Sequence, residues 1–253
     1  MSSGQIVRED SLKETFDMKD DYRLDLKRLF RALKHTLYHP TNALIFLSQI
    51  VRHGSGPSLK YTYKKMLETR VGGQMAFKSE EILHYIPELK DRPAGSVGRI
   101  SYEKFKQAQL KVVKISRRQA NDKWIDAEHP YSWMARRYRD THDFWHVLTG
   151  YPTTIDGEMC LAMFSFAQTR SLSWLVIGLT ILFDLGRPFR ERDFTLTRLR
   201  MAYEAYKNGK KAKFLLAENY DKLLSENLQD ARERLNVRRP RFFVDRSPEL
   251  LKL

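Results

Sequence analysis

Apolar residues recur along this chain at the three- and four-residue spacing of an α-helix, and the period-two alternation of a half-buried strand is hard to find. The clearest stripe comprises Leu26, Leu29, Phe30, Leu33 and Leu37. Because short turns join the helical stretches and no β-rich block separates them, the sequence predicts an all-α fold. We expect a single helical-bundle-like domain of about eight to ten helices.

Turn-forming residues set the expected helix boundaries. The first stripe stops at Pro40, since proline cannot continue a helix, and the next helix is expected to end at the cluster Gly54-Ser55-Gly56-Pro57. Pro87 to Gly98 is the longest expected loop. The other predicted helices cover residues 58–70, 79–84, 101–117, 131–149, a stretch starting near 156, 173–185, 191–207 and 211–235.

Charge and composition suggest three parts. Residues 1–21 are expected to form an acidic flexible N-terminus, residues 22–236 the all-α domain, and residues 237–253 a basic tail. Within the domain, 22–90 is predicted to be a looser basic helical part, whereas 91–236 contains the motif described below.

The positive charge is concentrated in the first half of the chain. The whole sequence carries a formal charge of +14, and residues 22–140 alone hold 24 basic and 11 acidic side chains. Such a surface attracts nucleic acid, anionic lipid or a small anionic ligand. No helix-turn-helix, zinc-finger or RNA-binding motif is evident, so we expect no nucleic-acid partner. We instead expect the basic half to face an anionic membrane surface, where each Lys or Arg adds roughly 1 kcal/mol of attraction.

The N-terminal segment is acidic and polar, which is unlike a signal or transit peptide. The most apolar stretch, residues 172–185, is shorter than the roughly 20 residues that span a bilayer. We therefore expect a cytoplasmic protein, peripheral on the inner membrane. The single cysteine, Cys160, excludes an internal disulfide framework and a zinc site built on several cysteines.

The strongest chemical signal is the run His142-Asp143-Phe144-Trp145-His146, followed after eleven residues by Glu158. Histidines at i and i+4 lie on one face of a helix and can share a metal ion. A short turn would return Glu158 beside them. Two histidines and a carboxylate leave positions open for substrate, as a catalytic metal site needs. Asp143 could be a fourth ligand or could orient an imidazole.

These residues also have ordinary explanations, since histidine pairs arise by chance and acidic side chains favour helix N-termini. Neighbouring side chains add candidates. Tyr138, one turn before His142, could donate a proton. The polar Ser165 and Gln168 could contact substrate, and the aromatic Phe164 and Trp174 could line an apolar channel; packing in the core is the more ordinary explanation for all four.

The motif and its flanks resemble the ubiquinone (coenzyme Q) biosynthesis protein 4 family. The similarity covers roughly residues 90–235 and departs in Asp156, where the family usually has an apolar residue, and in the basic C-terminal extension. Its further segments are Gly95-Ser-Val-Gly-Arg99 with Tyr102, Arg137-Tyr-Arg-Asp140, Gly150-Tyr-Pro-Thr153, Gln168-Thr169, Asn208-Gly-Lys-Lys211 and Tyr220-Asp221.

The resemblance implies a divalent metal, most often assigned as Zn²⁺, held by His142, Asp143, His146 and Glu158. It also implies removal of the C1 carboxyl from a polyprenylated 4-hydroxybenzoate intermediate at the membrane, contacts with other ubiquinone-biosynthesis enzymes, and a homodimer. We expect a bacterial member. The metal would hold the benzoate while Tyr138, Asp143 or a water at the metal protonates the ring, unless the carboxyl is lost oxidatively.

Two other functions fit the residues. One is a non-catalytic scaffold that binds an isoprenoid or quinone intermediate. The other is an HD-type metal phosphohydrolase, which would need His84 or His129 and Asp184 or Asp193 as further ligands and leaves Glu158 unexplained.

Overall fold

The computed structural model describes residues 24–38, 43–105, 128–185 and 195–244. Within these ranges the chain forms ten α-helices, two 3₁₀ helices and no strand beyond one isolated bridge, so the predicted all-α fold is confirmed. The elements are α2 (Leu26–Tyr38), α3 (Ala43–Leu67), α4 (Arg70–Phe77), η2 (Ile82–Asp91), α5 (Val97–Phe105), α8 (Pro130–Thr149), α9 (Ile155–Thr169), α10 (Leu172–Leu182), α11 (Leu196–Lys211), η4 (Leu215–Ala217), α12 (Tyr220–Ser225) and α13 (Leu228–Leu235).

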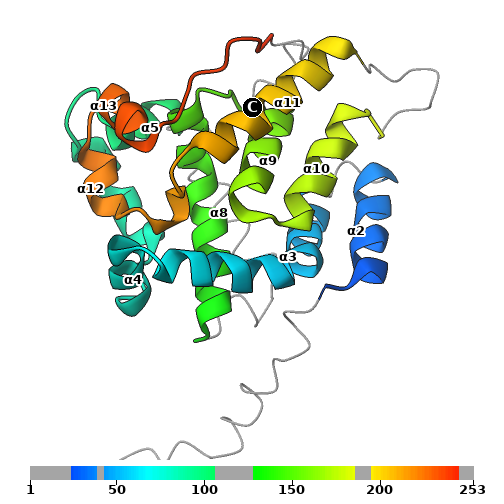
Figure 1. The fold of residues 1–253 in the computed structure, drawn as a ribbon, viewed down its shortest axis with the longest axis horizontal. Helices are drawn as coiled ribbons and strands as arrows, with labels where there is room; N and C mark the ends of the chain where they lie inside the picture. Colours follow the sequence, from blue (N-terminus) through cyan, green and yellow to red (C-terminus); the bar gives the residue numbers. More distant parts are fainter. Residues whose placement is uncertain (1–23, 39–42, 106–127, 186–194, 245–253) are drawn as a thin grey trace, which may run out of the picture.

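Helix α8 runs through the middle of the molecule, between α9 to α11 and the short helices α4, α5, α12 and α13 (Figure 1). Its ends follow from local sequence. Pro130 occupies the first turn, where a missing N–H costs nothing, and the side chain of His129 caps the backbone N–H of Tyr131. Gly150 adopts φ +83° and ends the helix. Helix α8 is buried on most of its surface because neighbours cover it on several sides.

One large apolar core joins α8 to the surrounding helices. Trp145 of α8 packs edge-on against Phe164 of α9, and its indole N–H donates to the hydroxyl of Tyr220 of α12 at 2.8 Å. A second, small cluster around Leu29 and Ile50 joins α2 and α3 to α10. The main core therefore surrounds the helix that carries the histidine motif, and α2 packs at the edge.

The turn predicted at Gly54 to Pro57 is wrong, because α3 continues through it. The small residues serve close packing instead. A Cβ at Gly54 would lie 2.7 Å from the hydroxyl of Ser173, and Ser55 hydrogen-bonds with the hydroxyls of both Ser171 and Ser173. Contacts with the N-terminal end of α10 thus outweigh the helix-breaking tendency of Gly and Pro.

Three other boundaries differ from expectation. The segment predicted as a helix and then a loop, residues 79–98, contains the 3₁₀ helix η2 and the start of α5. Helix α11 continues past Gly209, where a Cβ would lie 2.5 Å from the carbonyl oxygen of Phe164. The long helix expected over 211–235 is divided into η4, α12 and α13. Residues 1–21 and the ends of the predicted 101–117 helix and 237–253 tail lie outside the described residues.

Candidate metal centre

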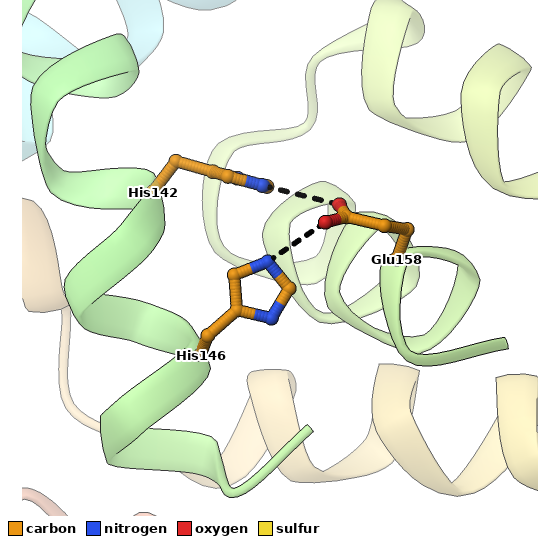
Figure 2. Close-up of side chains that lie close together, drawn as sticks. All are labelled: His142, His146 and Glu158. Carbon is orange, nitrogen blue, oxygen red and sulfur yellow. Dashed lines mark hydrogen bonds and ion pairs between the residues drawn. The ribbon is translucent and has the colours of Figure 1, made fainter. Parts of the chain in front are cut away.

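A tight turn between α8 and α9 brings Glu158 back towards the histidines. The hydroxyl of Thr154 accepts from the backbone N–H of Gly157 and caps α9. Gly157 is required sterically, since a Cβ there would lie 1.9 Å from the carbonyl oxygen of Pro152. The glycine lets the chain fold tightly, and the next residue, Glu158, lies in the first turn of α9 facing α8 (Figure 2).

His142, His146 and Glu158 form one three-residue cluster (Figure 2). Nε2 of His142 lies 3.3 Å from Oε2 of Glu158, and Nε2 of His146 lies 3.1 Å from Oε1. One ligand atom from each side chain falls within 4.8 Å of the others. The side chain of His146 is 3% exposed, whereas that of Glu158 is 37% exposed. The cluster is therefore buried on the His146 side and open on the Glu158 side.

The two imidazoles fit a metal ion. Nδ1 of His146 lies 3.0 Å from the backbone carbonyl of Tyr151, which can only accept, so Nδ1 carries the proton. Nε2 of His146 is then a lone-pair nitrogen that is buried and faces Oε1 of Glu158 at 3.1 Å. Such a nitrogen, held by a hydrogen bond from the other ring atom, is the usual form of a histidine ligand. Two nitrogen ligands and one oxygen ligand are a donor set that suits a divalent cation.

Electrostatics couple the three side chains. Burial alone lowers the pKa of His142, but the hydrogen bond and charge of Glu158, with the charge of Asp143, outweigh it and raise this pKa above its ordinary value of 6.5. Burial tends to raise the pKa of Glu158, yet the two histidines outweigh it and hold this pKa far below its ordinary value of 4.5. Glu158 is thus a carboxylate at neutral pH, as a metal ligand must be.

Trp174 of α10 forms one wall of the site. Its ring stacks on that of His142, with centroids 5.2 Å apart and planes 2° from parallel. The imidazoles of His142 and His146 meet edge to face at 5.0 Å. His142 is therefore fixed between an indole and an imidazole, and the role of Trp174 in lining an apolar channel stays a prediction.

Comparison with known proteins agrees with this geometry. The model of the family described as Coenzyme Q (ubiquinone) biosynthesis protein Coq4 matches residues 29–241. The chain belongs to the Coq4 family. The three clustered side chains lie inside the matched region, as do α8, the turn and α9.

Curated Coq4 proteins are similar in sequence. Mitochondrial ubiquinone biosynthesis protein COQ4 of Candida tropicalis is 30% identical over 192 residues, which are 73% of this chain and 56% of that protein. The Botryotinia fuckeliana protein is 29% identical over 155 residues, 61% of this chain and 52% of its own. The chain thus spans about half the length of these relatives. They are fungal, and the bacterial origin stays a prediction.

A crystal structure of a candidate ubiquinone biosynthesis protein from Nostoc punctiforme shares the fold. It superposes with a TM-score of 0.59 at 17% identity, covering 85% of this chain and 99% of the other. Among the residues that the structure describes, no helix of this Coq4 family member is long and apolar enough to cross a membrane.

Asp143 does not join the three-residue cluster, although it neighbours His142 in the chain and acts on it by its charge. Its predicted role as a fourth ligand stays a prediction. Its alternative role, as a side chain that orients an imidazole, stays a prediction as well.

Tyr138 points away from the metal centre, towards α3. Its hydroxyl donates to Thr62 at 2.9 Å, and Thr62 in turn donates to the carbonyl of Ser58. Burial raises the pKa of Tyr138 well above its ordinary range, although its hydroxyl neighbours oppose that shift. The hydroxyl proton of Tyr138 thus joins α8 to α3, and the role of Tyr138 as a catalytic proton donor stays a prediction.

Gln168 and Phe164 were predicted to contact substrate or lipid; the structure places both in the packing between helices, and their predicted contacts stay predictions. The amide of Gln168 donates to the carbonyl of Gly209 at 2.7 Å and accepts from the N–H of Leu215 at 3.0 Å. Phe164 is fully buried in the main core. Ser165 is also buried, and its hydroxyl has no hydrogen-bond partner. The amide of Gln168 thus joins α9 to α11 and η4, as burial of a polar group requires, whereas the hydroxyl of Ser165 makes no such link.

Two features of the site had no signal in sequence reasoning. The carbonyl of Tyr151 orients His146, and a backbone acceptor of this kind leaves no trace in residue types. The second is the partner of Asp156, since nothing in the sequence connects this residue to α11. The carboxylate of Asp156, at the start of α9, is fully buried and pairs with Arg198 of α11 at 2.8 Å. The buried acid is thus matched by a base on the helix that packs against α9.

The HD-type phosphohydrolase lacks its further ligands. Among the described residues, the potential metal-binding group contains neither His84, His129 nor Asp184. His129 instead caps the far end of α8. Asp193 lies outside the described residues.

Proposed function

We propose that this chain acts in ubiquinone biosynthesis as a metal-dependent carboxy-lyase. The substrate would be a polyprenylated 4-hydroxybenzoate intermediate, and the bond broken would join ring carbon C1 to its carboxyl group. The observation that carries this proposal is the half-open cluster of His142, His146 and Glu158. Three protein ligands leave positions at which a substrate carboxylate can bind.

We further propose Zn²⁺ as the resident ion, because two imidazoles and one carboxylate suit it. A divalent cation held there supplies positive charge that orients and polarises the substrate carboxylate. Glu158 and the two histidines fix its position, and the carbonyl of Tyr151 keeps the ring of His146 in the required orientation.

Other residues of the chain would handle the ring and the proton. Asp143 is next to His142 in the chain and half-buried, and it is the group that, in its protonated form, we assign to proton transfer at C1. Trp174 is half-buried beside His142 and offers an aromatic and apolar wall at the open side. Helix α10, which carries Trp174, is apolar along most of its length and would border the isoprenoid tail.

The substrate class implies a membrane setting, because a polyprenylated benzoate is dissolved in lipid. We propose that the protein binds an anionic inner-membrane surface from the cytoplasmic side and meets other ubiquinone-biosynthesis enzymes there, as a homodimer. The net charge of +14 supports attraction to such a surface.

The test is decarboxylation by purified protein. Protein loaded in turn with Zn²⁺, Mn²⁺, Co²⁺ or Fe²⁺ is mixed in detergent micelles with a polyprenylated 4-hydroxybenzoate labelled at the carboxyl carbon. We expect metal-dependent release of labelled CO₂, reduced at least about 100-fold in His146→Ala. His84→Ala, which changes an exposed histidine outside the cluster, is the matched control and should keep full activity.

The product of the reaction shows how the carboxyl group is lost. A hydrogen at C1 means simple protonation, whereas a hydroxyl at C1 means oxidative loss of the carboxyl. Metal-dependent binding of the labelled substrate with no CO₂ under air, for any of the four ions, would refute the lyase and favour a non-catalytic carrier.

A further inference from the structure

Helix α11 has two different faces. Met201, Ala202 and Ala205 are buried against the main core, on the side that packs on α9. The outer face exposes large apolar side chains: Leu196 is 79% exposed and Tyr203 60%. Leu199 lies on the same outer face. Water-exposed residues of this size on a folded helix need a reason, because they gather at helical spacing instead of lying singly.

The C-terminal strap, residues 241–244, enlarges this surface. Its backbone is fixed on α11 by the carboxylate of Glu204, which accepts from the N–H groups of Arg241 and Phe242. Phe242 and Val244 are exposed beside the helix. Five of the thirteen exposed large apolar side chains among the described residues thus lie on α11 and the strap.

Cations lie on and beside these apolar groups. The guanidinium of Arg200 lies 3.7 Å from the ring centroid of Phe242, and the ammonium of Lys207 lies 5.3 Å from that of Tyr203. Between helix and strap is a hollow of about 420 Å³ that contains two arginines and no acidic residue. Its lining residues are Leu196, Thr197, Arg200, Arg241, Phe242, Phe243 and Val244.

We propose that α11 and the strap form the surface through which the protein docks on an anionic phospholipid membrane. The exposed apolar side chains enter the headgroup region, and Arg200 and Arg241 bind a lipid phosphate at the hollow. Apolar residues surrounded by Lys, Arg and Tyr are the pattern of a helix that lies in a membrane interface. This inference rests on the membrane association proposed above and gives it a place, on α11 instead of the basic half that the sequence suggested.

Charge favours a membrane over a second copy of the chain. A two-fold interface brings a surface onto itself, so the cations of the hollow would face cations, and Glu204 beside the hollow is already engaged by the backbone N–H groups of Arg241 and Phe242. An anionic lipid brings negative charge to the two arginines. The position is also useful, since α11 packs directly on α9, the helix that carries Glu158.

The test is sedimentation with vesicles. Protein is mixed with vesicles of phosphatidylcholine alone or with one quarter phosphatidylglycerol. We expect binding to the anionic vesicles only, lost on raising NaCl from about 0.1 M to about 0.5 M. Arg200→Glu/Arg241→Glu and Leu196→Ser/Leu199→Ser/Tyr203→Ser should each reduce binding at least about tenfold. Val71→Ser/Phe77→Ser, which changes exposed apolar residues on α4, should bind like the parent.

Three results would overturn the proposal. The first is parent-like binding to anionic vesicles by both α11 variants, whether or not Lys27→Glu/Arg31→Glu on α2 reduces binding. The second is equal binding to neutral vesicles. The third is a change from dimer to monomer in the triple serine variant, measured by light scattering, which would make the surface a subunit interface.

Failure here is distinguishable from failure of the proposed reaction. His146→Ala should bind vesicles like the parent, because it leaves α11 and the strap intact. Conversely, Arg200→Glu/Arg241→Glu should still release CO₂ in detergent micelles, where no membrane is needed.

Discussion

His146 donates its Nδ1–H to the backbone carbonyl of Tyr151 at 3.0 Å, which leaves its Nε2 unprotonated and 3.1 Å from a carboxylate oxygen of Glu158. Two lone-pair atoms at that distance repel unless a proton or a cation lies between them. The turn that follows α8 thus does two things. It supplies the carbonyl that sets the imidazole tautomer, and it returns Glu158 to the same point.

Removing the charge of Glu158 should weaken metal binding. In Glu158→Gln the side chain keeps its size but loses its negative charge, so we expect the dissociation constant for Zn²⁺ to rise about 100-fold or more. Competition with a chromophoric chelator measures it. Glu68→Gln, at an exposed position on another part of the chain, is the control. Equal affinity in parent and Glu158→Gln would show that the ion binds elsewhere.

The cluster should also give the metal-free protein a characteristic pH dependence. The raised pKa of His142 stabilises the fold fully below pH 6.5, and this contribution is lost as pH rises through the raised pKa. The lowered pKa of Glu158 stabilises the fold above pH 4.5, and that contribution is lost as pH falls towards the lowered pKa. The stability difference between parent and Glu158→Gln, from urea unfolding, should therefore be largest between these two values.

A bound metal ion should reverse the loss of stability that the metal-free protein shows as pH rises through the pKa of His142. A bound ion requires neutral imidazoles, so the stabilisation by Zn²⁺ should grow as pH rises through the pKa of His142. The measurement is the urea unfolding midpoint at pH 6 and pH 8, with and without Zn²⁺. The shift of the midpoint by Zn²⁺ should be larger at pH 8. A metal effect that is independent of pH would contradict the assignment of His142 as a ligand.

The sequence predicts the helical class and the three-residue cluster because both depend on local spacing. A histidine pair at i and i+4 needs only a helix, and Glu158 needs only the short turn after it. The continuous α3 and the roles of Tyr138 and Gln168 could not be predicted, because each depends on contacts with distant segments. Gly54 looks like a turn residue until α10 packs on it, and Gln168 looks free until α11 and η4 use its amide.

Glycine should be essential at position 157, whereas alanine should be tolerated at Gly73 in α4. Gly157→Ala places a Cβ against the carbonyl of Pro152, so the turn must open and Glu158 must move. We expect a loss of several kcal/mol, about 3 or more, together with loss of metal binding. Gly73→Ala is the matched control. Apart from its chain neighbours and the nearby backbone of α4 itself, nothing lies within 4 Å of its Cβ position, and the substitution should stabilise the protein by about 0.5–1 kcal/mol. Urea unfolding of both variants decides.

The buried pair of Asp156 and Arg198 should be required as a pair. Asp156→Ala leaves the Arg198 guanidinium, which is 9% exposed, without its carboxylate, and we expect a loss of about 3–5 kcal/mol. Replacing both, as in Asp156→Leu/Arg198→Met, removes the two charges together and should recover most of that loss. As a control, Glu103→Gln breaks the exposed pair with Arg99 and should cost less than about 1 kcal/mol. If the double variant is as unstable as Asp156→Ala, the pair does more than neutralise charge, and the turn that carries Glu158 depends on Asp156 itself.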